Sequence, residues 1–206
     1  MAKIKVYHGS NCLVKEPSLS YGREDADFGI GFYVTTDVEM AEKWAARRSN
    51  PIINVYTVDL ESLNGLEFGL NKGWLDFVVQ NRSGNKRVEI DLSEVDYIKG
   101  ATADDRLFAV VEQYESNLLD VDTAIKAMNA MKIGEQIALV SEESVGNLEF
   151  CNSYNLSEER KMELKNMLGA MRKETNEIVE KILRDRVKEE NEKPGPLPAF
   201  RKKRGR

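Results

Sequence analysis

Two glycines standing directly before a run of aromatic and β-branched residues constrain this chain more than any other feature. Residues 27–37 read Asp-Phe-Gly-Ile-Gly-Phe-Tyr-Val-Thr-Thr-Asp, a pattern that predicts a tight turn leading into a strand. Glycine at such a place permits positive φ angles and lets a ligand approach the backbone closely. Residues 38–48 then have the pattern of a helix with an acidic residue in its first turn.

A second segment, residues 7–10, reads Tyr-His-Gly-Ser and ends a predicted strand at His8, the only histidine of the chain. A lone histidine on a first strand is usually structural, and Phe32 and Tyr33 are equally compatible with a place in the core. The two glycines alone do not make a dinucleotide-binding fingerprint, because a third glycine and a preceding strand are missing. The order and spacing of the two segments nevertheless favour one cleft shared by His8 and Tyr33.

These segments carry a resemblance to a known superfamily. The chain has the motif Tyr-His-Gly-Ser, then about twenty residues later Phe-Gly-x-Gly-Phe-Tyr-x-x-x-Asp, and then a helix with an aromatic residue. This succession resembles the ADP-ribosyltransferase superfamily. The likeness is to the diphtheria-toxin and poly(ADP-ribose)-polymerase branch, and more closely to a small bacterial family of toxin-like domains of unknown function placed among those transferases. Three further blocks, at residues 74–82, 103–105 and 136–137, extend the resemblance over residues 3–150.

The resemblance implies that NAD⁺ is a substrate and that nicotinamide is the leaving group. It assigns a ribose contact to His8, a carboxamide contact to the Gly9 backbone, and stacking on the nicotinamide ring to Tyr33. Trp44 falls at the position of a second stacking aromatic residue, although a core position on an amphipathic helix fits it equally well.

Arg23 lies in a turn-rich segment, residues 11–26. Its default interpretation is a solvated loop charge. In a cleft that accepts a dinucleotide, its guanidinium would instead suit a pyrophosphate. The remaining predicted NAD⁺-binding positions are Ser10 and Gly31.

Two positions depart from the polymerase branch. Ala41 stands where that branch has a serine that contacts the carboxamide, and Gln136 stands where it has a glutamate. Glu135 directly precedes Gln136, and since side chains alternate along a strand, only one of the two can face the cleft. The resemblance favours Gln136, which cannot act as a base. A base or acceptor-side group would then come from Asp104, Asp105 or Glu135, although acidic residues at a helix start need no catalytic role.

The resemblance therefore implies a mono-ADP-ribosyltransferase in which His8, Tyr33 and Gln136 are catalytic, and we expect no metal and no permanently bound cofactor. The glutamine favours single transfer over chain elongation, and the acceptor is a protein or a nucleic acid. The resemblance also implies a toxin of a toxin–antitoxin or phage-defence module, with a cognate antitoxin as a possible partner. Two alternatives stay open: a fold that binds NAD⁺ or ADP-ribose without turnover, and a scaffold that acts through its C-terminal helix.

Composition limits the other function classes. The hydrophobic content of 41% supports a packed core, while no apolar run approaches the ~18 residues of a membrane span, so no membrane partner is expected. The N-terminus lacks a signal-peptide pattern, which favours the cytoplasm. Cys12 and Cys151 form neither a disulfide framework nor a metal-ligand spacing, and are expected to be small buried residues.

Charge is distributed unevenly along the chain. Residues 155–206 hold 15 Lys and Arg against 10 Asp and Glu, whereas the first 154 residues hold 15 against 25. An acidic domain disfavours non-specific binding of nucleic acid, but the basic tail leaves it possible.

Hydrophobic periodicity predicts both strands and helices, among them a long C-terminal helix. The resemblance implies an α+β fold with an ADP-ribosyltransferase-like core, in which a split, mixed or antiparallel β-sheet carries peripheral helices. The expected strands are residues 3–8, the segment around Tyr33, 52–60, 88–92, 96–100 and 136–140. The expected helices are residues 38–48, 73–82, a helix from 104 onward, 121–131 and 157–190. The chain would divide into a transferase-like domain (1–154), an amphipathic helical extension (155–192) and a basic, proline-containing tail (193–206).

Overall fold

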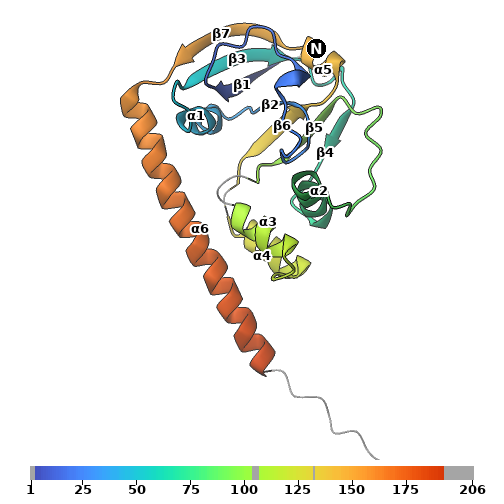
Figure 1. Cartoon of the computed structure of the whole chain (residues 1–206), viewed down its shortest axis with the longest axis vertical. Helices are drawn as coiled ribbons and strands as arrows, with labels where there is room; N and C mark the ends of the chain where they lie inside the picture. Colours follow the sequence, from blue (N-terminus) through green and yellow to red (C-terminus); the bar gives the residue numbers. More distant parts are fainter. Residues whose placement is uncertain (1–2, 104–106, 132, 193–206) are drawn as a thin grey trace, which may run out of the picture.

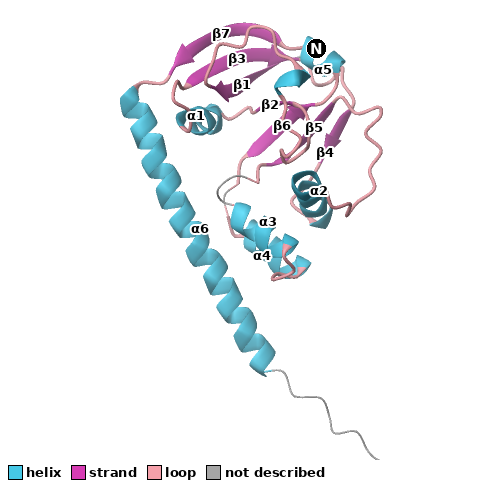
Figure 2. Cartoon of the chain, in the orientation of Figure 1, coloured by secondary structure: helices cyan, strands magenta, loops and turns pink. Residues whose placement is uncertain are grey.

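The computed structural model describes residues 3–103, 107–131 and 133–192. The strands are β1 (Ile4–Ser10), β2 (Phe32–Val34), β3 (Ile52–Val58), β4 (Gly65–Glu67), β5 (Tyr97–Ala101), β6 (Glu135–Leu139) and β7 (Glu149–Asn155). The helices are α1 (Val38–Ala46), α2 (Lys72–Ser83), α3 (Phe108–Glu115), α4 (Val121–Asn129), α5 (Glu142–Gly146) and α6 (Glu158–Glu192), with a short 3-10 helix η1 (Leu19–Tyr21). The expected α+β class is confirmed (Figure 2).

The strands form two sheets. One is antiparallel with the order β1-β3-β7, and the other is mixed with the order β2-β6-β5-β4, since β4 and β5 run parallel. A backbone bridge joins them: the Tyr7 N–H donates to the Thr35 carbonyl over 2.8 Å, and the Thr35 N–H donates to the Tyr7 carbonyl over 3.0 Å. This joint holds β1 beside β2 where the two sheets meet (Figure 1).

Apolar side chains of both sheets pack together in one cluster, which includes Val6, Phe32, Tyr56 and Ile137. A second cluster covers the first sheet with α1, and a third covers the second sheet with α2, α3 and α4. Strand alternation decides which cluster a side chain joins. On β2, Phe32 lies in the cluster between the sheets, whereas Tyr33 packs against the helical cluster on the other face.

The long helix α6 packs along the body of the protein (Figure 1). Where the burial of its side chains is described, the buried residues are Leu164, Leu168, Thr175 and Val179, spaced so that they share one face. Leu164 belongs to the cluster under α1 and Val179 to the cluster of α3 and α4, so α6 connects two cores. No helix in the described parts of the chain has the length and apolar character needed to cross a membrane.

Three sequence predictions of local structure are wrong. Residues 88–92 are not a strand, because the Gln80 side chain accepts the Arg87 and Val88 N–H groups over 2.7 and 3.0 Å and holds the segment as a loop. Strand β4 was not among the expected strands. Strand β7 was not expected, because its polar, mostly exposed residues at a sheet edge lack the alternation of a half-buried strand.

Both cysteines are exposed, contrary to the expectation that they are buried. Cys12 lies in the loop that follows β1, and Cys151 lies on the edge strand β7. Neither position is covered by another element, so the preference of cysteine for burial is not realised here.

Gly9 marks a close approach of β1 to α1. A Cβ at this position would collide with the Ala41 carbonyl oxygen and lie 2.9 Å from the Ala45 backbone nitrogen. We expect Gly9→Ala to lower the free energy of unfolding by about 1–3 kcal/mol, because α1 must shift. The control is Gly169→Ala in α6, where an added Cβ meets nothing within 4 Å; it should raise stability by ~0.5–1 kcal/mol.

Urea denaturation of both variants measures the two effects. Equal stability of Gly9→Ala and the wild-type protein would contradict the close packing of β1 on α1.

Candidate functional site

The structure brings eight predicted residues to one cleft, with a volume of about 970 Å³. This is near the upper end of the ~300–1,000 Å³ typical of small-molecule sites. The predicted residues that line it are His8, Gly9, Ser10, Arg23, Gly31, Tyr33, Trp44 and Gln136. They come from β1, β2, α1, β6 and the loop between β1 and β2.

His8 and Tyr33 are directly linked. Nδ1 of His8 lies 2.7 Å from the Tyr33 carbonyl oxygen, and its ring stacks on Phe32 with centroids 4.4 Å apart. Burial lowers the pKa of His8, the hydrogen bond to Tyr33 opposes this, and the positive charge of Arg48 lowers the pKa further. The imidazole is therefore neutral at pH 7. Because a carbonyl only accepts, Nδ1 carries the proton and Nε2 is left as an acceptor, suited to a ligand hydroxyl.

Tyr33 is fixed by the turn that precedes it. Its hydroxyl donates to the Gly29 carbonyl over 2.8 Å and accepts the Phe28 N–H over 2.9 Å. Gly29 has a φ of 78°, a conformation that glycine adopts without strain. Burial raises the pKa of Tyr33, so the hydroxyl stays protonated. Since both hydroxyl contacts are internal, Tyr33 offers its ring rather than its hydroxyl to a ligand.

Helix α1 places Trp44 at the cleft. The helix begins where the Asp37 carboxylate accepts the Glu39 and Met40 N–H groups, a standard N-terminal cap. One turn before Trp44, Ala41 is fully buried. The position at which the polymerase branch has a serine therefore holds a buried alanine in this chain, which offers no side-chain hydrogen bond to a ligand.

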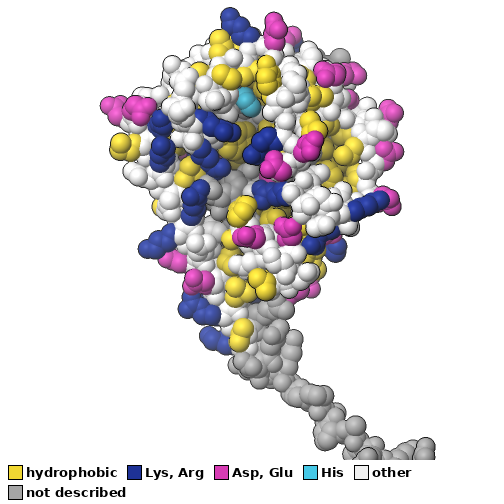
Figure 3. Space-filling view, viewed as in Figure 1, with side chains coloured by type: hydrophobic (Ala, Val, Ile, Leu, Met, Phe, Trp, Pro, Cys, Tyr) yellow, Lys and Arg dark blue, Asp and Glu magenta, His cyan; other side chains and the backbone are white. Residues whose placement is uncertain are grey.

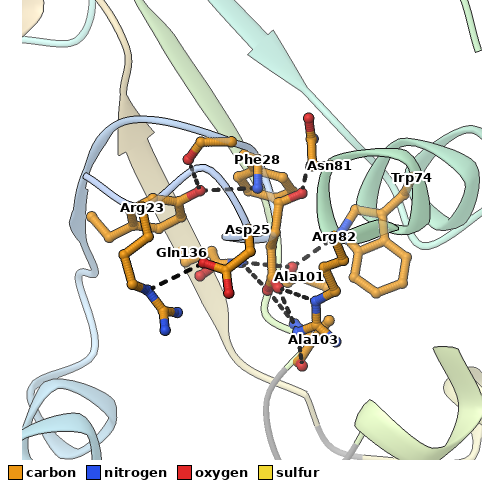
Figure 4. A network of polar contacts seen from close by, with 12 residues as sticks. Arg23, Asp25, Phe28, Trp74, Asn81, Arg82, Ala101, Ala103 and Gln136 are labelled. Atoms are coloured by element: carbon orange, nitrogen blue, oxygen red, sulfur yellow. Dashed lines mark hydrogen bonds and ion pairs between the residues drawn. The ribbon is translucent and has the colours of Figure 1, made fainter. Parts of the chain in front are cut away.

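A buried carboxylate, Asp27, organises the other side of the cleft. It accepts four hydrogen bonds: from Arg82 Nε and Nη2 (2.9 and 2.6 Å), from the Ala103 N–H (2.8 Å) and from Gln136 Nε2 (2.7 Å). Figure 4 shows Arg82, Ala103 and Gln136 within one network of polar contacts. Arg82 also donates to the Ala103 carbonyl, and Asn81 donates to the Asp27 carbonyl.

This network determines the orientation of the Gln136 side chain. Its Nε2 donates to Asp27 and, more weakly at 3.4 Å, to the Ala101 carbonyl. Within the described residues, its side-chain oxygen accepts no hydrogen bond, so that oxygen is the atom available to a ligand in the cleft. A glutamate here would place two carboxylates in contact, since Asp27 requires a donor at this position.

Glu135 does not face the cleft. It is exposed, and its carboxylate lies 3.6 Å from Lys99 Nζ. Because neighbouring residues of a strand point to opposite faces, the buried position of Gln136 directs Glu135 away. Of the two neighbours, Gln136 is therefore the one that lines the cleft.

Asp27 and Arg82 are two residues of the cleft that were assigned no role from the sequence. Both stand inside the motif segments, but they are 55 residues apart and nothing in a single sequence pairs them. Arg23, in contrast, was predicted; it is exposed, and its Nε lies 3.8 Å from an Asp25 oxygen.

Two predicted acidic residues, Asp104 and Asp105, lie outside the described residues. Among the residues that are described, no group of three His, Cys, Asp or Glu side chains is placed to hold a metal ion.

Comparison with known proteins identifies the family. Residues 4–150 match the family described as "Protein of unknown function (DUF3990)". The chain belongs to the DUF3990 family. The match covers the second sheet, strands β1 and β3 of the first sheet and the whole cleft; it ends inside β7 and leaves out α6. Neither the curated proteins nor the solved structures gave a match.

The hydrogen bonds of Asp27 should contribute strongly to the stability of the folded protein. We expect Asp27→Asn to lower the free energy of unfolding by about 2–3 kcal/mol, because Arg82 loses its charged partner. This is below the ~3–5 kcal/mol for fully buried pairs, since 21% of the Arg82 side chain remains exposed. Asp25→Asn, at an exposed carboxylate two residues away, should change stability by less than ~0.5 kcal/mol. Urea denaturation of the two variants measures both; equal effects would contradict the network.

The lowered pKa of His8 predicts a pH dependence. The ordinary value is 6.5, so below about pH 6.5 the unfolded chain binds a proton at His8 that the folded chain does not. Stability should then fall as the pH drops from 6.5 towards the lower folded-state pKa. His8→Gln removes this contribution, so the wild-type protein should lose stability more steeply than the variant between about pH 7.5 and 5. If the free energies of unfolding of the wild-type protein and of His8→Gln change in parallel with pH, His8 is not held neutral in the folded protein.

Proposed function

We propose that this protein is a mono-ADP-ribosyltransferase, which cleaves NAD⁺ and transfers ADP-ribose to a macromolecular acceptor. The observation that carries the proposal is that His8, Tyr33 and Gln136 line one cleft. They come from β1, β2 and β6, which are far apart in the sequence. Motif resemblance singled these residues out without reference to their arrangement in space, and their convergence supports the assignment.

The cleft offers complementary contacts to the nicotinamide riboside half of NAD⁺. Neutral His8 presents Nε2 as an acceptor for a ribose hydroxyl. The ring of Tyr33 offers a face to the positively charged pyridinium, an interaction favoured by the aromatic quadrupole. Trp44 lines the same cleft from α1 and would form the opposite wall.

The reaction breaks the bond between ribose C1′ and the pyridinium nitrogen. Nicotinamide leaves with the electron pair as a neutral molecule, and positive charge develops on the ribose. A nucleophile of the acceptor then bonds to C1′ and gives up its proton. The cleft contributes by holding the ribose and the leaving group in place.

Gln136 sets a limit on this chemistry. Its side-chain oxygen, which accepts no hydrogen bond from the described residues, can accept one from a ribose hydroxyl. A neutral amide, however, neither takes up a proton nor offsets positive charge. This supports a single transfer rather than elongation of an ADP-ribose chain. Asp104 and Asp105 are the remaining candidates for the base.

The proposal extends to the biological setting on the strength of the resemblance alone. It includes a role as a toxin of a toxin–antitoxin or phage-defence module, action in the cytoplasm, and neutralisation by a cognate antitoxin. The acceptor is a protein or a nucleic acid.

A second candidate function is binding of NAD⁺ or ADP-ribose without turnover. The observation that favours it is Gln136 itself, which stands where the polymerase branch has a glutamate. Release of nicotinamide distinguishes the two functions. A scaffold function through α6 is less well supported, since the buried face of α6 already packs into two cores.

The test is incubation of the purified full chain with NAD⁺ carrying a label in its adenylate half, in the presence of cell lysate. We expect nicotinamide release and label on a macromolecule. His8→Ala and Tyr33→Ala should each lower the rate by about tenfold or more, equivalent to ~1.4 kcal/mol of transition-state stabilisation. The control is Tyr154→Ala, which removes a tyrosine of the edge strand β7 outside the cleft and should leave the rate unchanged.

Sensitivity of the labelled product to nuclease or to protease then classifies the acceptor. If NAD⁺ binds but no nicotinamide is released, the protein is a binding module and the transferase proposal fails. Equal rates in all three variants would show that the cleft is not the site of reaction.

A further inference from the structure

Basic side chains gather at the cleft of an acidic protein. Among the described residues that line it, five are basic and two are acidic, whereas the whole chain has a net charge of -5. The basic residues are Lys15, Arg23, Arg47, Arg48 and Arg82, and the acidic ones are Glu16 and Asp27. Lys and Arg side chains gather on the face where the one histidine is visible (Figure 3).

Two of these cations make no ion pair with any described residue, although many of the other described Lys and Arg side chains do. Elsewhere, basic side chains meet carboxylates, as in the pairs Lys43–Glu39 at 2.6 Å and Arg160–Glu42 at 2.7 Å. The side chains of Lys15 and Arg48 make no hydrogen bond or ion pair with any residue that the structure describes. Uncompensated positive charge beside a cleft attracts anions.

The two cations stand on segments that are held in place. The loop of Lys15 is fixed to β3, because the Asn54 side chain accepts the Val14 N–H over 2.9 Å and donates to the Cys12 carbonyl over 3.1 Å. Arg48 follows the end of α1, and two residues later the Asn50 side chain donates to the Asn11 carbonyl of that same loop over 3.1 Å. The segments carrying Lys15 and Arg48 are therefore tied to each other, and such preorganisation favours binding.

The charge of Arg48 also reaches the part of the cleft that holds His8, whose pKa it lowers. His8, Arg48 and Lys15 line the same cleft, so a ligand whose ribose contacts His8 has both cations within that cleft to receive its next groups. In a dinucleotide, the group next to the ribose is the diphosphate, which carries two negative charges.

We propose that Lys15 and Arg48 form an anion subsite that binds the diphosphate of the dinucleotide, with Arg23 at its edge. The inference rests on the proposed function and adds to it the residues that hold the central part of the substrate. A guanidinium and an ammonium together suit a diphosphate, since the first forms paired hydrogen bonds and the second acts as a point charge.

The test compares two double variants of the full chain. Lys15→Gln/Arg48→Gln removes the subsite, and Lys126→Gln/Lys165→Gln removes the same charge from exposed positions on α4 and α6, away from the cleft. Calorimetric titration with inorganic pyrophosphate, ADP-ribose and nicotinamide gives the affinities. The subsite variant should bind ADP-ribose and pyrophosphate about 100-fold more weakly, at roughly tenfold for each lost charged contact. Its affinity for uncharged nicotinamide should be unchanged.

The control variant should bind all three ligands like the wild-type protein. Equal weakening of ADP-ribose binding in both double variants would overturn the subsite and leave only a general effect of net charge. Weakened binding of a short RNA, with ADP-ribose unaffected, would overturn it in favour of an acceptor site.

The two proposals fail in distinguishable ways. If the wild-type protein cleaves NAD⁺ and the subsite variant has the same KM, the subsite is wrong and the proposed function stands. If the subsite variant loses pyrophosphate and ADP-ribose binding but no protein releases nicotinamide, the subsite stands and the transferase proposal fails.

Discussion

The buried carboxylate of Asp27 is the interaction on which the shape of the cleft depends. It joins the glycine turn before β2, helix α2 through Arg82, the chain after β5 through Ala103, and strand β6 through Gln136. A carboxylate with so little exposure is tolerated only because every partner is a donor and one of them is charged. The same turn fixes the hydroxyl of Tyr33. One buried anion therefore positions two of the three residues proposed to act on the substrate.

The network also gives a physical reason for the glutamine at position 136. Asp27 needs a hydrogen-bond donor 2.7 Å away, and the amide of Gln136 supplies it. A glutamate at that place would either repel Asp27 or share a proton with it. The departure from the polymerase branch is thus consistent with the rest of this cleft. Ala41 is a comparable case, because its position is fully buried.

Local patterns predicted much of the fold. The alternation of β3, the capped start of α1 and the apolar spacing of α2 are encoded in neighbouring residues, and each element forms close to its expected bounds. Strands β4 and β7 were missed because they are held by pairing with distant strands and their own residues carry little pattern. Residues 88–92 show the opposite case: a strand-like pattern is overridden when the Gln80 side chain takes up the backbone groups.

The site was predictable only in part for a similar reason. His8, Tyr33 and Gln136 stand in short motifs, whereas the partnership of Asp27 with Arg82 depends on how α2 packs against the glycine turn. The choice between Glu135 and Gln136 required the register of β6 against its neighbours, which a single sequence does not contain. The proposed pairing of Lys15 with Arg48 likewise depends on a long-range contact, because Asn50 ties the end of α1 to the loop after β1.

The measurement that tests the account most directly is a crystal structure of the full chain with an analogue of NAD⁺ that cannot be cleaved. The account predicts that the nicotinamide lies against the ring of Tyr33, that a ribose hydroxyl donates to Nε2 of His8, and that the diphosphate lies beside Arg48. An analogue bound elsewhere on the protein, or a cleft that stays empty at saturating concentration, would contradict it.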